Sequence, residues 1–290
     1  MKRDDELGIG IGGSKARKFA SLYFEIKKKK PSIIVVEGSL NSNNVLGITA
    51  LLNSSGQKTI LALPDSKSEN LGNAPWIKQI LNTDILKVDS TNGENETYYK
   101  EQLNCEAIFV IKEGACQIES IPGLLSLGKE IIHHQENNNV KFDNIFVDSG
   151  TGITAISTYI ALSLDGQFPK YFITLIAGNE EEFFSTALDL ITKFNKRFGK
   201  RVSINKKQFK FIRPTTSKSF GSINSTIRAE WLKMMNELGF PIDITYTAKH
   251  FFTVKNQLKS IDNSSINLVL NCGSWISARN HEHLLINNHQ

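Results

Sequence analysis

Short runs of β-branched and aromatic residues alternate with helical patterns along most of this chain, and this alternation constrains the fold more than any other feature. In the first half, the runs that predict strands are Ile33–Val36, Thr59–Leu63, Ile85–Val88 and Ile108–Ile111, and helical patterns lie at Ala16–Ile26 and Val45–Leu52. Strands that alternate with helices are typical of a parallel sheet with helical crossovers. The sequence therefore predicts an α/β fold.

The second half of the chain repeats the scheme. Its predicted strands are Ile145–Val147, Tyr171–Ile176, Phe209–Ile212 and Asn267–Leu270, and its predicted helices lie near Ala155–Leu164, Glu181–Phe194 and Ser225–Leu238. The polar segment Gln135–Asn139 lies between the two sets of strands, so we expect it to connect two units. A chain of 290 residues is long enough for two domains, each with its own core.

Charge and hydropathy argue against two classes of partner. The 34 basic and 29 acidic residues give a formal net charge of +5, well short of the dense basic face of a nucleic-acid-binding protein. The one basic tract, Lys27–Lys30, ends a predicted helix, where positive charge is stabilised by the helix dipole. The apolar run Tyr171–Ala177 is too short to span a membrane, which takes about 20 such residues. We expect neither a nucleic-acid nor a membrane partner.

The ends of the chain and its cysteines suggest a cytoplasmic protein without a metal. Three scattered cysteines do not form a disulfide framework, and the charged N-terminus lacks the apolar core of a signal peptide. His281 and His283 flank Glu282, but without the spacing of a closed metal site. We therefore expect no metal ion.

The densest chemical signal is the glycine-rich segment Gly8–Lys18. Gly8, Gly10 and Gly13 fit the spacing of a dinucleotide-binding loop, but that loop must follow a buried strand, which Met1–Leu7 is not expected to supply. The segment also nearly fits a P-loop. There, however, the lysine is displaced by one position and lacks the hydroxyl neighbour that would hold magnesium.

A third interpretation is that Lys15 forms a Schiff base at the start of the helix Ala16–Ile26, where glycines let the backbone lie close to a flat ligand. Such a lysine must be partly desolvated or near other positive charge, so that the neutral amine is available. Arg17 and Lys18 are nearby in sequence. A solvated side chain is the alternative, and spacing alone does not decide between the two.

Motifs spread over nearly the whole chain resemble those of a known family. They are Lys2–Asp5, Gly12–Lys18, Glu37–Asn44, Glu113–Ala115, Ser149–Thr154 and Ile244–Lys249. In type and order they are similar to the motifs of the 1-aminocyclopropane-1-carboxylate deaminase and D-cysteine desulfhydrase family. The resemblance implies pyridoxal 5′-phosphate (PLP) as cofactor, bonded to Lys15, and the tryptophan-synthase-β-like PLP fold type II.

The resemblance also implies how the chain is divided and how it assembles. A large PLP-binding domain would consist of residues 1–17 and 131–290, and a small domain of residues 18–130. Each would be a mostly parallel sheet covered by helices. The family pattern further implies a homodimer.

A loop between a predicted strand and a predicted helix is where the resemblance puts the phosphate of the cofactor. Its residues are Gly150, Thr151, Gly152, Ile153 and Thr154. Backbone N–H groups at a helix N-terminus bind phosphate well. The alternative is an ordinary turn in which a threonine caps the helix.

Three polar residues at the start of another helix match the family's substrate-binding segment, although Ser39–Asn41 before them depart from its pattern. By resemblance, Ser42 would contact the substrate carboxylate or move its proton, and Asn43 would hydrogen-bond the phenolic oxygen of the cofactor. Asn44 would contact the substrate. Capping of the helix is the competing role for the serine and its neighbour.

Four further positions bear on the choice of substrate. Tyr246 matches a tyrosine that assists proton transfer, and Thr247 stands where deaminases carry glutamate and desulfhydrases carry threonine or serine. Cys272 replaces the threonine that approaches the pyridine nitrogen, and a thiol is a poorer hydrogen-bond partner. Phe220 stands where the family often has a tyrosine near the substrate.

Together these residues favour a PLP-dependent lyase that acts on a small amino acid. The first hypothesis is α,β-elimination from D-cysteine, which gives pyruvate, ammonia and sulfide. The alternatives are 1-aminocyclopropane-1-carboxylate deamination, another β-elimination on the same fold, or a non-catalytic PLP-binding protein, because a fold does not determine the reaction.

Overall fold

The computed structural model describes residues 1–8, 12–64, 73–80, 83–88, 96–274, 281 and 283–286. The chain divides into two compact units. The larger consists of Met1–Arg17 and Ile121–Gln290, and the smaller of Lys18–Ser120. Every strand and helix predicted above is present, with bounds that differ by a few residues at most, so the predicted α/β class is confirmed.

The larger unit is built on a five-stranded sheet in the order β1-β9-β6-β7-β8, with every neighbouring pair parallel. Its strands are β1 (Lys2–Arg3), β6 (Asn144–Ser149), β7 (Lys170–Leu175), β8 (Phe209–Ile212) and β9 (Asn267–Asn271). Its helices are α5 (Ile121–Asn138), α6 (Ile153–Leu164), α7 (Glu180–Phe198), α8 (Ser225–Leu238), α9 (Thr247–Leu258) and α10 (His283–Ile286). Short 3-10 helices lie at Asp4–Glu6 and Lys206–Gln208.

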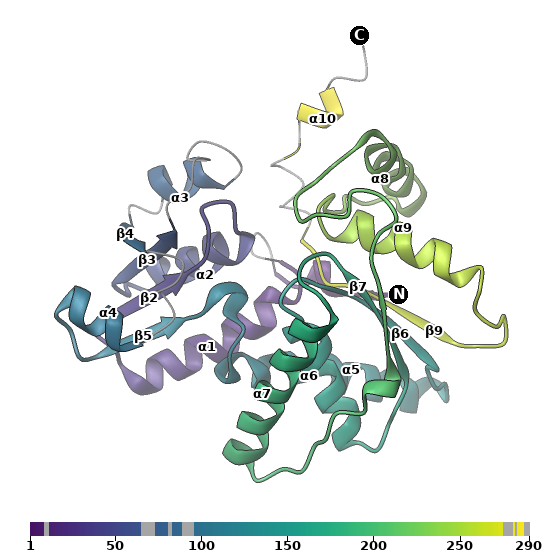
Figure 1. The fold of residues 1–290 in the computed structure, drawn as a ribbon, viewed down its shortest axis with the longest axis horizontal. Helices are drawn as coiled ribbons and strands as arrows, with labels where there is room; N and C mark the ends of the chain where they lie inside the picture. The colour runs from purple at the N-terminus through teal and green to yellow at the C-terminus, as the bar shows by residue number, and fades with distance from the viewer. Residues whose placement is uncertain are drawn as a thin grey trace. The chain divides into compact units, whose positions relative to one another are not determined.

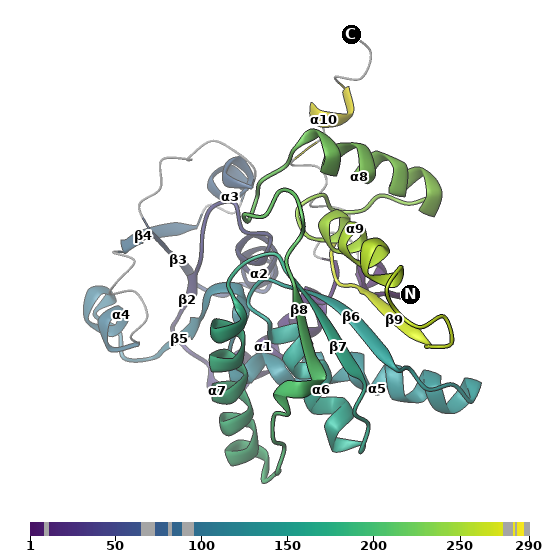
Figure 2. The same cartoon turned by 45° about the vertical axis from the view of Figure 1, so that its right-hand side comes forward.

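Helices cover both faces of this sheet (Figures 1 and 2). On one face, Val254 of α9 packs against the stacked rings of Phe146 and Phe172, whose centroids are 4.6 Å apart. On the other face, the ring of Tyr159 from α6 packs against Tyr171. Successive residues of a strand point to opposite faces, so α6 and α9 lie on opposite sides of the sheet. Full burial of each such aromatic side chain contributes about 1.5–3 kcal/mol to stability.

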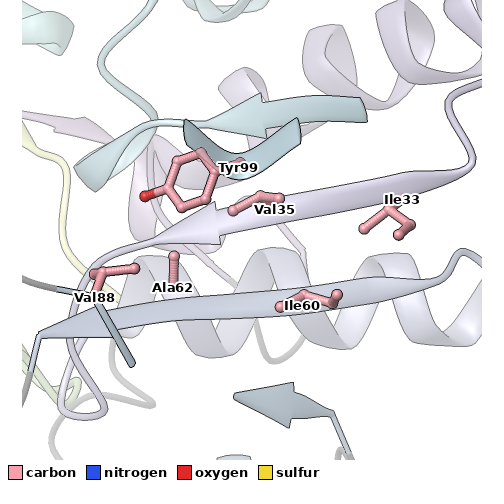
Figure 3. Close-up of a cluster of buried hydrophobic side chains, with 6 residues drawn as sticks. All are labelled: Ile33, Val35, Ile60, Ala62, Val88 and Tyr99. Carbon is pink, nitrogen blue, oxygen red and sulfur yellow. The ribbon is translucent and has the colours of Figure 1, made fainter. Parts of the chain in front are cut away.

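The smaller unit contains a four-stranded parallel sheet in the order β4-β3-β2-β5. Its strands are β2 (Ile33–Glu37), β3 (Thr59–Pro64), β4 (Asp84–Val88) and β5 (Ile108–Ile111), and its helices are α2 (Asn43–Ser54), α3 (Ala74–Ile80) and α4 (Glu96–Leu103). Short 3-10 helices lie at Glu113–Ala115 and Ile118–Ser120. Alternate residues of neighbouring strands form an apolar cluster with the ring of Tyr99 (Figure 3). The members of this cluster are Ile33, Val35, Ile60, Ala62, Val88 and Tyr99. Helix α1 (Lys15–Lys29) starts in the larger unit and continues in the smaller one.

Two expectations about chain organisation were wrong. Residues Gln135–Asn138, expected as part of a connection, form the last turn of helix α5. The compact units divide at the start of this helix, at Ile121, whereas the expected boundary near residue 130 falls inside it. The first residues also form a strand, because Lys2 and Arg3 pair in parallel with Leu270 and Asn271.

Two searches of the described part of the chain were negative. No helix there is long and apolar enough to cross a membrane. No group of three or more histidine, cysteine, aspartate or glutamate side chains there could hold a metal ion. Glu282, between the two histidines of the C-terminal segment, lies outside the described residues.

Candidate functional site

Four segments of the larger unit meet at the carboxyl ends of β6 and β9. They are the start of α1, the loop after β6, the start of α9 and the loop after β9. The backbone N–H of Ser14 donates to the carbonyl oxygen of Cys272 at 3.2 Å, and the hydroxyls of Ser14 and Thr154 lie 3.3 Å apart. In parallel α/β sheets, ligands bind at this edge.

Gly13 brings Lys15 to this edge. Its φ of +77° lies in the left-handed region, and a Cβ there would collide with the carbonyl oxygens of Cys272 and Gly273. Only glycine fits such a close approach of two backbones. The helix then begins at Lys15, which remains partly exposed. Gly10, the middle glycine of the dinucleotide-binding pattern, lies outside the described residues.

Two carboxylates that the sequence analysis did not single out lie near this lysine. Burial raises the pKa of Asp148 to about 6, the nearby Asp243 raises it further, and Lys15 opposes the rise. Burial, followed by the charge of Asp148, also raises the pKa of the Cys272 thiol well above its usual value. That thiol is therefore neutral at physiological pH. The position of Asp148 at the end of a predicted strand, two residues before Gly150, was the signal that could have identified it.

The loop after β6 is shaped to leave the start of α6 accessible to an anion. The N-cap position of α6 is Gly152, with a φ of +82°, so no side chain caps the helix from that position. The expectation of an N-capping threonine was therefore wrong. The first N–H groups of a helix have no partner within the helix, and together with the helix dipole they attract anions. Thr154 adds a hydroxyl, which faces Ser14.

Tyr246 packs directly against this loop. A Cβ built on Gly150 would lie 3.4 Å from the ring and from the hydroxyl of Tyr246, so the phenol covers the glycine. The carboxylate of Asp243 holds the tyrosine in place, because it accepts hydrogen bonds from the backbone N–H of Thr245 at 2.9 Å, of Tyr246 at 3.1 Å and of Thr247 at 2.7 Å. The hydroxyl of Thr247 donates to Oδ1 of Asn271 at 3.3 Å.

The remaining predicted site residues lie in the smaller unit. The hydroxyl of Ser42 accepts hydrogen bonds from the backbone N–H of Asn44 at 3.2 Å and of Val45 at 3.3 Å, so it caps α2 as the alternative predicted. Oδ1 of Asn43 accepts from Nδ2 of Asn73 at 2.8 Å. The side chain of Asn44 is buried, and neither polar atom of its amide has a partner within the described residues.

The polar groups at the edge of the larger unit fit PLP, the cofactor that the resemblance implies. An aldehyde needs an amine, which Lys15 provides, and a phosphate needs an anion site, which the start of α6 provides. Nδ2 of Asn271 is buried and has no partner within the described residues. Such a donor costs about 1–3 kcal/mol unless a ligand or water pairs with it.

Comparison with known proteins gives similar proteins at the level of sequence and of structure. No family model matches the chain. A Pyrococcus horikoshii protein with the provisional name 1-aminocyclopropane-1-carboxylate deaminase is 26% identical over 259 residues, which are 87% of this chain and 77% of the relative. The crystal structure of an ACC deaminase homologue has a TM-score of 0.82 at 22% identity, and the match covers 98% of this chain and 87% of that chain. A hydrogen sulfide-producing enzyme from Fusobacterium nucleatum has a TM-score of 0.61 at 14% identity, and the match covers 91% and 87% of the two chains. This chain therefore shares their fold.

Proposed function

The chain belongs to the family of 1-aminocyclopropane-1-carboxylate deaminases and D-cysteine desulfhydrases, and from this premise we propose that it is a PLP-dependent lyase or deaminase of a small amino acid. Its architecture is that of PLP fold type II. The observation that carries the proposal is the close packing of Gly13 against the loop after β9, which brings Lys15 to the same edge as the Gly150 loop.

In this proposal each matched segment holds a different part of the cofactor. The amine of Lys15 bonds to the aldehyde carbon. The N–H groups at the start of α6, with the hydroxyls of Thr151 and Thr154, bind the phosphate. The neutral thiol of Cys272 lies toward the ring nitrogen. When bound, PLP supplies an electron sink for the negative charge that develops at the substrate α-carbon.

The chain's own groups would then move the protons. Lys15, displaced by the amine of the substrate, accepts a proton at the α-carbon and is the proposed general base. Tyr246, held over Gly150, is placed to exchange a proton with the substrate. We propose that Ser42, Asn43 and Asn44 contact the substrate or the cofactor, as the family pattern implies.

We propose D-cysteine-type substrates first, because Thr247 carries a hydroxyl where the deaminase branch carries a carboxylate. In α,β-elimination the Cα–H and Cβ–S bonds break, and hydrolysis with one water gives pyruvate, ammonia and hydrogen sulfide. The second candidate is deamination of 1-aminocyclopropane-1-carboxylate, which is favoured by the name of the Pyrococcus relative. Other β-eliminations and a non-catalytic PLP-binding role follow from the same site with altered substrate contacts.

The absorption spectrum of the purified protein tests the proposal. We expect a band near ~410–420 nm, as PLP bound to a lysine produces, and we expect Lys15→Ala to remove it. Lys249→Met is a matched control, since it removes another lysine of the same unit and should retain the band. Borohydride should couple the cofactor to Lys15 in the wild type. A peptide labelled at any other lysine would contradict the assignment.

Parallel assays decide between the candidate reactions. D-cysteine, L-cysteine, β-chloro-D-alanine and 1-aminocyclopropane-1-carboxylate should be tested at equal concentrations. Faster turnover of the cyclopropane would overturn the desulfhydrase assignment, and a bound cofactor without turnover of any amino acid would favour the non-catalytic role. We further propose a cytoplasmic homodimer, and a monomeric mass in solution would contradict the dimer.

A further inference from the structure

The segment Ser217–Gly221, which we call the strap, lies between β8 and α8 and carries Phe220 over Tyr246. Both ends of the strap have left-handed backbone, with a φ of +50° at Ser217 and +75° at Gly221. The ring of Phe220 meets that of Tyr246 edge to face with centroids 5.7 Å apart, and 59% of Phe220 is exposed. The strap therefore has few apolar contacts to hold it, and its position depends on hydrogen bonds.

A buried lysine provides one of these bonds. Lys249 is 1% exposed, and its Nζ donates to the carbonyl oxygen of Ser219 at 3.0 Å. The same oxygen accepts from the backbone N–H of Ser222 at 3.2 Å and from its hydroxyl at 2.7 Å. Arg213 donates to the carbonyl oxygen of Lys218 at 3.4 Å and so holds the neighbouring residue.

Lys249 is costly as a purely structural residue. Burial lowers the pKa of its amine, and the nearby Asp243 only partly opposes this effect. An apolar side chain of similar length would fill the same space without the desolvation of an ammonium group. Its distinct contribution is therefore the bond to the strap. Lys249 follows Tyr246 by three residues on α9, so the two side chains lie on adjacent parts of one helix face.

We propose that Lys249 is a positioning residue that holds the strap, and with it Phe220, against Tyr246, so that the strap forms one wall of the amino-acid site and selects side chains by size. This inference rests on the proposed function for the identity of the ligand. The hydrogen bond between Lys249 and Ser219 does not depend on it. The two parts can therefore be tested separately.

Limited trypsin digestion tests the first part without the cofactor or a substrate. The exposed Lys218 lies within the strap and is itself a cleavage site, which mass spectrometry can follow at the bond between Lys218 and Ser219. Local release of a segment raises the population open to protease, so we expect Lys249→Met to accelerate this cleavage about 10-fold. Lys255→Met is the control, because it removes an exposed lysine of the same helix that pairs with Glu230. Equal rates in the wild type and Lys249→Met would overturn the inference.

Steady-state kinetics test the second part. With the best substrate found, we expect Lys249→Met to raise KM about 10-fold and to change kcat less than about 3-fold, because binding and not chemistry is lost. Lys249→Arg, which keeps a donor, should recover most of the loss. The double variant with Phe220→Leu should be no worse than the worse single variant, since both changes act through one ring. Additive losses would overturn the role of the strap in selection.

The two failures can be distinguished. If the wild type binds PLP but turns over no amino acid, the proposed function fails, and amino-acid affinity measured from the change in the cofactor spectrum replaces KM in the same comparison. An unchanged affinity in Lys249→Met would then overturn the selection role. Unaltered thermal unfolding of each variant confirms that its effect is local.

Discussion

Two polar clusters surround the first turn of α1, and they differ in how completely their groups are paired. Arg17 is buried, and its five N–H donors make five hydrogen bonds. Two reach Asp4, both at 2.8 Å, two reach Glu130, both at 2.7 Å, and one reaches Ser126 at 2.6 Å. Lys2 adds an ion pair to each carboxylate.

The cluster around Lys15, two residues earlier, is the opposite case. Within the described residues, Lys15 makes no hydrogen bond or ion pair, Asp148 shows no partner for its carboxylate, and Nδ2 of Asn271 is unpaired. Unpaired buried groups lower the stability of a fold, whereas a paired network raises it. The contrast indicates that Arg17 fixes the start of α1, and that the groups around Lys15 are left for a ligand.

The largest expected effect is the loss of the Arg17 cluster. Arg17→Ala leaves the buried carboxylate of Asp4 without its partner, and breaking a buried ion pair in this way costs about 3–5 kcal/mol. Urea unfolding of the cofactor-free protein measures it. Arg201→Ala, at an exposed arginine, should change the free energy of unfolding by less than about 0.5 kcal/mol. A similarly small change in Arg17→Ala would remove the contrast between the clusters.

The second prediction uses pH to separate the clusters. The hydrogen bonds of Arg17 lower the pKa of Glu130 to about 2, so its contribution to stability is present above pH 4–5 and is lost as the pH falls toward 2. Asp148 has the opposite sign. Because its pKa is raised to about 6, the folded state binds more protons than the unfolded chain between about pH 4 and pH 6, and stability falls as the pH rises through that window.

Replacing Asp148 by Asn should therefore stabilise the cofactor-free protein at pH 7.5, by roughly 1–2 kcal/mol, and the gain should vanish below about pH 4. Thermal unfolding of the wild type and Asp148→Asn across this range measures the difference. Asp165→Asn, at an exposed carboxylate of the same unit, is the control and should show no such pH dependence. A pH-independent difference in Asp148→Asn would show that its carboxylate does not ionise near pH 6.

The difference between the clusters also separates what was predictable from the sequence from what was not. The strands were predictable because runs such as Ile33–Val36 are apolar on both faces, as buried parallel strands require. Helix α5 was missed because it contains Pro122, Gly123 and Gly128 and ends in polar residues. Gly128 is needed there because its missing side chain lets α5 approach Ala161 of α6. That contact is tertiary and leaves no local signal.

The candidate site was predictable only in its segments. The glycines around Lys15 and the Gly150 loop stand out because close backbone approaches and left-handed turns require glycine. The carboxylates of Asp148 and Asp243 do not stand out, because a single aspartate has many ordinary roles near a turn. Whether a buried amide is paired depends on residues far away in the chain, so the unpaired state of Asn271 and Asn44 could not be predicted.

The smallest expected effect concerns Asn44, where both polar atoms of a buried amide are unpaired. Asn44→Leu keeps a similar volume and removes the unpaired groups, so we expect the cofactor-free protein to gain up to about 1 kcal/mol of stability. Asn73→Leu is the matched control, because the amide of Asn73 donates to Oδ1 of Asn43 at 2.8 Å and to the carbonyl oxygen of Asn41 at 3.1 Å. That variant should lose about 1–2 kcal/mol.

The gain in Asn44→Leu should be accompanied by a loss of amino-acid affinity in the cofactor-bound protein. A group that is destabilising in the free protein persists where its partner is a ligand, and removal of that group then weakens binding. Urea unfolding and spectral titration with D-cysteine measure the two changes on the same preparation. If Asn44→Leu is destabilised as much as Asn73→Leu, the amide is paired in solution, and the distinction between satisfied and ligand-ready groups does not extend to the smaller unit.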